Sequence, residues 1–237
     1  MKKYTEGIFF KKYWEWFSTP HDVPGVAIAN FFSYESADVP GFKRKESLTS
    51  VIDLSQSLEQ IWKKMRKKFL REQIEKGNRK GVVATESKNF GAFMPMYDRF
   101  TRRSDFDAIS ETALRNGLLF LASFEGQPIA GGVFVVDGKN MRALALASER
   151  LDEKNGRRRD IIGEANRIVI WAAISYAKDK GYSLFDLGGI APDSENAHWR
   201  AVAIFKEAFG GERKKAYYYH KIYSRIMCAV RAIRMRF

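Results

Sequence analysis

The chain has 237 residues, of which 45% are hydrophobic and 29% are charged, and its formal net charge is +13. This composition is that of a folded globular protein and excludes a disordered or fibrous one. The apolar runs are shorter than the roughly 18 to 20 residues of a membrane-spanning helix, and no signal-type segment follows the N-terminus, so we expect a cytoplasmic protein. One cysteine and three separated histidines predict neither a disulfide nor a metal site. The positive charge predicts a phosphate-bearing partner, such as tRNA or coenzyme A, with a solvated basic surface as the alternative.

The first half of the chain predicts a mixture of strands and helices. In chain order, the pattern predicts a short helix in residues 1–17, a strand at 26–32, a loop at 35–45, a strand at 50–54, a helix at 58–80, a strand at 82–85, and helices at 89–103 and 107–115. The helix at 58–80 has one apolar face, and its other positions are rich in lysine and arginine. Pro95 is expected in the first turn of its helix, because proline has no amide hydrogen to donate.

The second half begins with a predicted three-stranded antiparallel meander. Its strands are expected at 118–124, 129–136 and 141–147, with turns between them. There follow a loop at 149–159, a helix at 162–180, a strand at 183–187, a loop at 193–199, a helix at 201–209 and a strand at 215–220. Strands and helices that alternate around such a meander predict a mixed α/β fold. Without a repeat or a linker, we expect one domain over residues 1–237, with an aromatic and basic preface at 1–20 and a basic amphipathic helix at 221–237.

Two basic segments are candidates for contact with anionic partners. The residues assigned to a tRNA or phosphate surface are Lys63, Lys64, Lys67, Lys68 and Arg71. Their helix lacks interleaved exposed aromatic residues for base stacking, so a solvated basic face is the alternative. The helix expected at 221–237 has apolar residues near one side, and it can lie at the inner face of an anionic membrane, dock on its own domain or join a homodimer.

Two motifs resemble the Fem-type aminoacyl and acyl transferases. Residues 182–190 contain an aromatic-Asp-x-Gly-Gly sequence, and residues 204–211 contain Phe-Lys-x-x-Phe-Gly-Gly. The likeness covers roughly residues 50–219 and also includes the helices at 96–103 and 165–181. It implies a GNAT (acyl-CoA N-acyltransferase) fold, with a mixed central sheet flanked by helices, and transfer of an acyl or aminoacyl group to an amine. Fem transferases usually have two copies of this fold, whereas this chain has room for one, as in related single-domain acetyltransferases.

The resemblance makes Asp186 and Lys206 the candidate catalytic residues. Asp186 ends a strand and precedes Gly188 and Gly189, where a ligand can approach the backbone while the carboxylate orients or deprotonates an amine. Lys206 follows Phe205 and can neutralise a phosphate or stabilise the oxyanion formed when an amine attacks an ester or thioester. The structural alternatives are an aspartate that caps a loop and a solvated lysine.

Donor binding is expected at the start of the helix at 162–180. Members of the fold that use coenzyme A bind its pyrophosphate with backbone amides of a Gly-rich loop at a helix N-terminus. This chain matches that loop poorly, although three consecutive arginines there can bind phosphate in a bidentate way. The residues assigned to substrate or donor binding are Ser148, Arg157, Arg158, Arg159, Asn166, Gly188, Gly189 and Phe205.

The sequence therefore predicts a transferase that forms an amide on an amine acceptor, such as a cell-envelope precursor or a peptide. Aminoacyl-tRNA is the expected donor, and no tightly bound cofactor is expected. One alternative is an N-acyltransferase that uses acyl-CoA. The other is a non-catalytic tRNA- or membrane-binding module of the same fold, because a fold does not dictate function.

Overall fold

The computed structural model describes residues 3–103 and 108–224. Contacts within the chain divide it into two compact units, one of residues Met1–Thr49 and Arg213–Phe237 and the other of residues Ser50–Glu212. The single domain expected over residues 1–237 stays a prediction. The helix expected in the tail lies outside the described residues, apart from positions 221–224.

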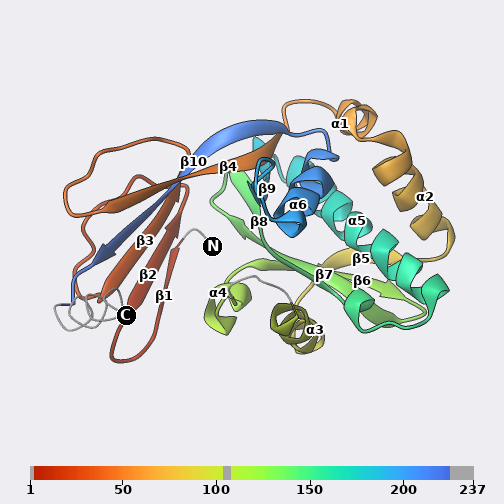
Figure 1. Ribbon diagram of the computed structural model, residues 1–237, viewed down its shortest axis with the longest axis horizontal. Helices are drawn as coiled ribbons and strands as arrows, with labels where there is room; N and C mark the ends of the chain where they lie inside the picture. Colours follow the sequence, from red (N-terminus) through yellow and green to blue (C-terminus); the bar gives the residue numbers. More distant parts are fainter. Residues whose placement is uncertain (1–2, 104–107, 225–237) are drawn as a thin grey trace. The chain divides into compact units, whose positions relative to one another are not determined.

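The first unit is built from strands (Figure 1). Its strands are β1 (Lys3–Glu6), β2 (Lys12–Trp16), β3 (Ile28–Ser33) and part of β10 (Glu212–Ile222). The pairs β1–β2 and β3–β10 are antiparallel, whereas β2–β3 is parallel. The prediction of a helix in residues 1–17 is therefore wrong. Tyr13, Trp14 and Trp16 belong to a strand, because aromatic side chains pack well on a pleated surface.

Two long strands run from one unit into the other. β4 (Lys43–Asp53) contains the strand predicted at 50–54, but it begins inside the loop predicted at 35–45. β10 contains the strand predicted at 215–220. Both strands were expected to be shorter, because the charged residues at the start of each strand show no apolar alternation.

The second unit contains a mixed sheet with the strand order β9-β8-β7-β6-β5. Its strands are β5 (Val83–Ser87), β6 (Leu118–Phe124), β7 (Gln127–Val136), β8 (Asn140–Ser148) and β9 (Leu184–Ile190). Neighbours are antiparallel except β8 and β9, which are parallel. The predicted meander is confirmed as β6, β7 and β8.

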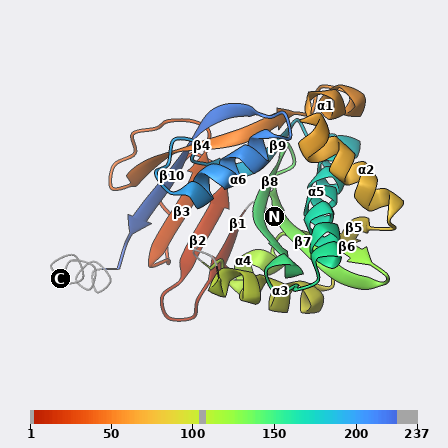
Figure 2. The same cartoon turned by 45° about the vertical axis from the view of Figure 1, so that its right-hand side comes forward.

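Helices cover both faces of this sheet (Figures 1 and 2). One face carries α1 (Leu58–Lys64), a π-helical turn η1 (Lys67–Arg71), α2 (Glu72–Arg79) and α5 (Gly156–Asp179); α3 (Phe90–Arg102) and α4 (Glu111–Arg115) lie on the other. Successive residues of a strand point to opposite faces. Accordingly, Phe120 belongs to the hydrophobic core on the side of α5, whereas Leu119 and Leu121 belong to the core on the other side, with Phe93 of α3. The predicted mixed α/β fold class is confirmed.

Three helix predictions need correction. The basic helix expected at 58–80 is interrupted after Lys64, where the backbone amide of Arg66 donates a hydrogen bond to the Ala208 carbonyl at 3.0 Å. The helix expected from 162 begins at Gly156, because Asn155 caps it by accepting a hydrogen bond from the Arg158 amide. Pro95 lies inside α3 rather than in its first turn.

The remaining helices agree with the predictions apart from their ends. α6 (Ala197–Glu207) begins four residues before the expected start at 201. α4 is shorter than the helix expected at 107–115, and residues 104–107 are outside the described part. Across the described ranges, every helix is too short or too polar to span a lipid bilayer.

Candidate active site

A cavity of about 580 Å³ lies in the second unit where two parallel strands separate. The pairing of β8 with β9 joins Asn140–Arg142 to Leu184–Asp186, and both strands continue beyond it. Leu144 is an extra residue in β8, since Phe134 pairs with Ala143 and Val133 with Ala145. Such a bulge bends a strand and interrupts its ladder. The separated segments of β8 and β9 thereby leave room for a ligand between α5 and α6.

A buried ion pair marks the point at which the strands separate. Arg142 of β8 and Asp186 of β9 are cross-strand neighbours, and their side chains are 4% and 0% exposed. Arg142 donates a hydrogen bond from Nη1 to Asp186 Oδ2, and the Gly188 amide donates to Asp186 Oδ1 at 2.7 Å. Both carboxylate oxygens of Asp186 thus accept hydrogen bonds from groups of the protein itself. Arg142 was missed by the sequence analysis, although a lone arginine in the apolar run 141–147 is a signal for it.

Lys206 extends from α6 to line the cavity next to this ion pair. Its ammonium donates a hydrogen bond to the Gly189 carbonyl at 2.8 Å. Burial, and then the positive charge of Arg142, lower the pKa of Lys206 from 10.5 to about 8, whereas Asp186 acts in the opposite direction. Gly188 has φ +87°, and a Cβ there would be 3.1 Å from Lys206 Nζ. A glycine is needed here both for the backbone conformation and for the space that Lys206 occupies.

Two further predicted residues meet in the wall of the cavity. Asn166 of α5 donates from Nδ2 to the Ser148 hydroxyl at 2.9 Å. The other amide atom, Asn166 Oδ1, is buried and has no hydrogen-bond partner within the described part of the chain. Turning the amide around would only exchange the atom that is left unpaired. A buried polar atom without a partner is costly, so this wall is suited to a polar group of a ligand.

Apolar side chains and two arginines form the remaining walls. The apolar lining comes mainly from Phe69, Tyr97, Phe100, Ile109, Leu144, Leu146, Val202 and Phe205. Arg150 and Arg167 also line the cavity, and sequence reasoning had given neither a role. Arg167 lies over the rings of Phe69 and Phe205, with centroid distances of 5.0 and 5.6 Å. Phe205, which was predicted to bind substrate, is therefore part of the same cavity.

The structure places the other predicted binding residues elsewhere. Arg157, Arg158 and Arg159 are in the first turn of α5 and are not among the residues that line the cavity. Arg158 is paired with Glu153 at 3.1 Å. The five cations of the predicted tRNA surface are on α1 and η1, where all but Arg71 are exposed and Lys63 is paired with Glu59. Their roles stay predictions.

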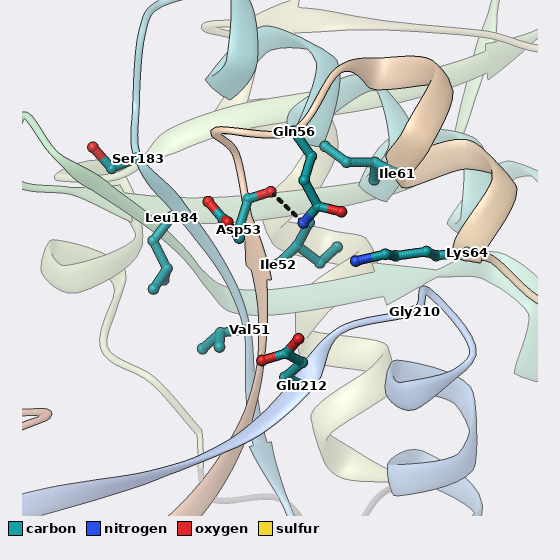
Figure 3. A pocket seen from close by; sticks show the side chains of 10 residues that line it. All are labelled: Val51, Ile52, Asp53, Gln56, Ile61, Lys64, Ser183, Leu184, Gly210 and Glu212. Carbon is teal, nitrogen blue, oxygen red and sulfur yellow. Dashed lines mark hydrogen bonds between the residues drawn. The ribbon is translucent and has the colours of Figure 1, made fainter.

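A second cavity of about 130 Å³ lies elsewhere in the same unit. Figure 3 shows its polar lining, in which Gln56 Nε2 donates to the Asp53 carbonyl at 3.1 Å and the Lys64 side chain extends along one wall. Glu212 lines the cavity on the side away from Gln56 (Figure 3). Of the predicted residues it contains only Lys64, so the cavity beside Lys206 is the candidate active site.

The comparisons with known proteins bear on the fold. No family model matches the chain, and no curated protein matches its sequence. The solved structure of FemX is similar, with 11% identity and a TM-score of 0.63, over 95% of this chain and 85% of FemX. The C-terminal domain of a putative lysylphosphatidylglycerol synthetase from Agrobacterium fabrum has 12% identity and a TM-score of 0.54, over 98% and 87% of the two chains. L-PGS from Bacillus licheniformis has 13% identity and a TM-score of 0.55, over 85% and 70%. The chain thus has the fold of these proteins.

Proposed function

We propose that this protein transfers an acyl or aminoacyl group from an activated donor to an amine and so forms an amide. The observation that carries the proposal is the position of Lys206, whose ammonium lines an apolar cavity between separated strands. The resemblance of residues 182–190 and 204–211 to Fem-type transferases supports this reading, as does the fold shared with FemX and with L-PGS. Aminoacyl-tRNA is the proposed donor.

The transfer requires stabilisation of a negative charge that appears during the reaction. The amine nitrogen attacks the carbonyl carbon of the donor ester, and the carbonyl oxygen becomes an oxyanion. The intermediate collapses when the carbon–oxygen bond to the tRNA breaks, and the amine proton ends on the released hydroxyl. A cation held in apolar surroundings stabilises such an oxyanion more than one in water, and we assign this role to Lys206. The orphaned Asn166 Oδ1 is placed to accept a hydrogen bond from the attacking amine.

Asp186 is proposed as a positioning residue rather than as the group that holds the amine. Its carboxylate is fully buried and bonded to Arg142 and to the Gly188 amide. These bonds hold the turn at Gly188, whose next residue, Gly189, accepts the hydrogen bond from Lys206. Asp186 therefore acts on the reaction through the placement of Lys206.

The test compares two donors with a simple amine that fits an apolar cavity. Purified protein is incubated with n-hexylamine and either a mixture of aminoacylated tRNAs or acetyl-coenzyme A, and the amide product is measured by mass spectrometry. We expect amide from the aminoacylated tRNAs, a loss of about 100-fold or more in Lys206→Met, and normal yield in Lys154→Met, which removes an exposed lysine of the same unit.

Each other outcome has a definite meaning. Product from acetyl-coenzyme A alone would replace the proposed donor and keep the transfer chemistry. The proposed function would be contradicted if the folded protein formed no more amide than the protein-free control with either donor.

A further inference from the structure

Arg150 and Arg167 bring two guanidinium groups together at the wall of the candidate active site. Both lie next to Gly163 of α5, because a Cβ added there would be 3.6 Å from Arg150 Cζ and 3.8 Å from Arg167 Nη1. Burial of Arg167, and then the positive charge of Arg150, lower the pKa of Arg167. Two like charges beside the same residue repel each other, so their placement costs free energy in the absence of an anion.

Nearby carboxylates do not neutralise Arg150. Three acidic residues are close to it in sequence, and each is paired with another arginine: Glu149 with Arg99, Asp152 with Arg99 and Arg103, and Glu153 with Arg158. Within residues 3–103 and 108–224, Arg150 has no carboxylate partner, and its residue is exposed. The acidic residues of this segment thus hold the surrounding helices and leave one cation available.

Arg167 is fixed in place but keeps unused hydrogen-bond donors. Its Nε donates to the Phe69 carbonyl at 3.0 Å and its Nη1 to the Gly163 carbonyl at 2.6 Å. Glu164, the acidic residue that favours its charged form, is bonded to Lys80 and lies 3.4 Å from Lys76. Nη2 of Arg167 has no partner among the described residues. A guanidinium oriented by two carbonyls and two aromatic rings is preorganised for a ligand.

We infer that Arg150 and Arg167 form a subsite for a phosphate group carried by a substrate of the transfer reaction. Two guanidinium groups can together neutralise a doubly charged phosphate, and their planar donors match its oxygen atoms. The apolar walls next to the pair accommodate the carbon chain or ring attached to that phosphate. Arg167 contacts Phe205, the neighbour of Lys206, so the subsite and the reacting centre share one cavity. The inference rests on the proposed function for the identity of the ligand as a substrate.

The test uses phenyl phosphate as the probe and phenol as its uncharged counterpart. Isothermal titration is carried out on the full chain at fixed ionic strength, because a protein of net charge +13 binds anions unspecifically. We expect saturable binding of phenyl phosphate, a dissociation constant at least tenfold higher for phenol, and a loss of about tenfold or more in Arg150→Gln. Arg79→Gln is the matched control, since it removes an exposed arginine of α2 that does not line the cavity, and it should change affinity less than twofold.

Competition then identifies the source of the phosphate. Displacement of phenyl phosphate by coenzyme A or by uncharged tRNA assigns the group to the donor, whereas binding that resists saturating amounts of both assigns it to the acceptor. Equal affinities for phenol and phenyl phosphate, or equal losses of affinity in Arg150→Gln and Arg79→Gln, would overturn the subsite. The titration needs no turnover, so the two proposals can fail separately. Binding of phenyl phosphate without amide formation removes the proposed function alone. Amide formation by the wild type, together with normal affinity of Arg150→Gln for phenyl phosphate, removes the subsite alone.

Discussion

At the scale of single residues, the buried pair of Arg142 and Asp186 has the clearest energetic consequence. The two charges lie at the end of the β8–β9 pairing, and each is desolvated. Removal of one partner leaves the other charge buried without compensation, which costs far more than the pair contributes as a whole. Breaking the pair therefore destabilises the point from which the cavity opens.

We predict that Arg142→Met lowers the free energy of unfolding by about 3–5 kcal/mol. Arg115→Met is the control, because Arg115 is paired with Glu111 one helical turn away on an exposed surface; it should cost about 0.5 kcal/mol or less. Urea denaturation measures both. Equal effects of the two substitutions would mean that the Asp186 charge is relieved in another way.

Gly188 supports a second residue-scale prediction, concerning activity. Gly188→Ala forces a side chain into a backbone with φ +87° and places its Cβ against Lys206 Nζ and 3.3 Å from the Ala143 carbonyl. We expect amide formation to fall by about tenfold or more, with destabilisation of about 1–3 kcal/mol. Gly126→Ala has a similar φ of +76° but open space around it, and should lose stability while keeping its transfer rate. Normal transfer by a folded Gly188→Ala would refute the proposed position of Lys206.

At the scale of elements, glycine sets the closeness of α2 to α5. Gly77 of α2 is buried, and a Cβ there would be 2.6 Å from Ile168 Cδ1 and 3.0 Å from Glu164 Cβ. Gly156, at the first position of α5, has open space around it. The same substitution should thus have opposite effects in the two helices.

We expect Gly77→Ala to destabilise the protein by about 1–2 kcal/mol, since overpacking outweighs the gain in helix propensity. Gly156→Ala should stabilise it by about 0.5 kcal/mol by restricting the unfolded chain. Thermal unfolding of the two variants side by side measures the difference. A stabilised Gly77→Ala would show that α2 can shift away from α5 without cost.

The elements also show what the sequence could predict. Apolar periodicity predicted the meander, α5 and β9, because these signals are local. Asp186 and Lys206 were singled out by the resemblance of their motifs to Fem-type transferases, and their roles stay predictions. The N-terminal strands were mistaken for a helix because Tyr13, Trp14, Glu15 and Trp16 do not show the regular alternation of apolar and polar residues that indicates a strand. The break after Lys64 depends on a backbone bond to Ala208, far along the chain. Arg150 and Arg167 come close together only through the packing of α5 against the end of β8, and no local sequence pattern predicts this proximity.

At the scale of the whole molecule, the net charge of +13 predicts binding to polyanions that weakens as salt rises. Two pairs of exposed lysines allow the site of that binding to be tested. Lys67 and Lys68 are exposed on η1, and Lys43 and Lys45 are exposed on β4. Substitution of either pair by glutamine lowers the net charge equally, so a difference between them reports position rather than total charge.

If η1 belongs to a tRNA surface, Lys67→Gln with Lys68→Gln should make the slope of log affinity against log salt shallower by about 2. Lys43→Gln with Lys45→Gln should change it by less than half as much. Filter binding of uncharged tRNA over a salt series measures both slopes. Equal changes would indicate unspecific attraction and would remove the assignment of this surface.

The measurement that tests the central claim most directly is the pH dependence of single-turnover amide formation in the wild type and in Lys206→Arg. Lys206 has a pKa lowered to about 8, so its ammonium is charged below that pH and neutral above it. Deprotonation of the attacking amine raises the rates of both proteins alike as the pH rises, so the ratio of the two rates reports on Lys206. If the charge stabilises the oxyanion, the wild-type rate divided by the Lys206→Arg rate falls as the pH rises through about 8, because the arginine stays charged. A ratio of the two rates that stays constant through pH 8 would contradict the assignment of Lys206.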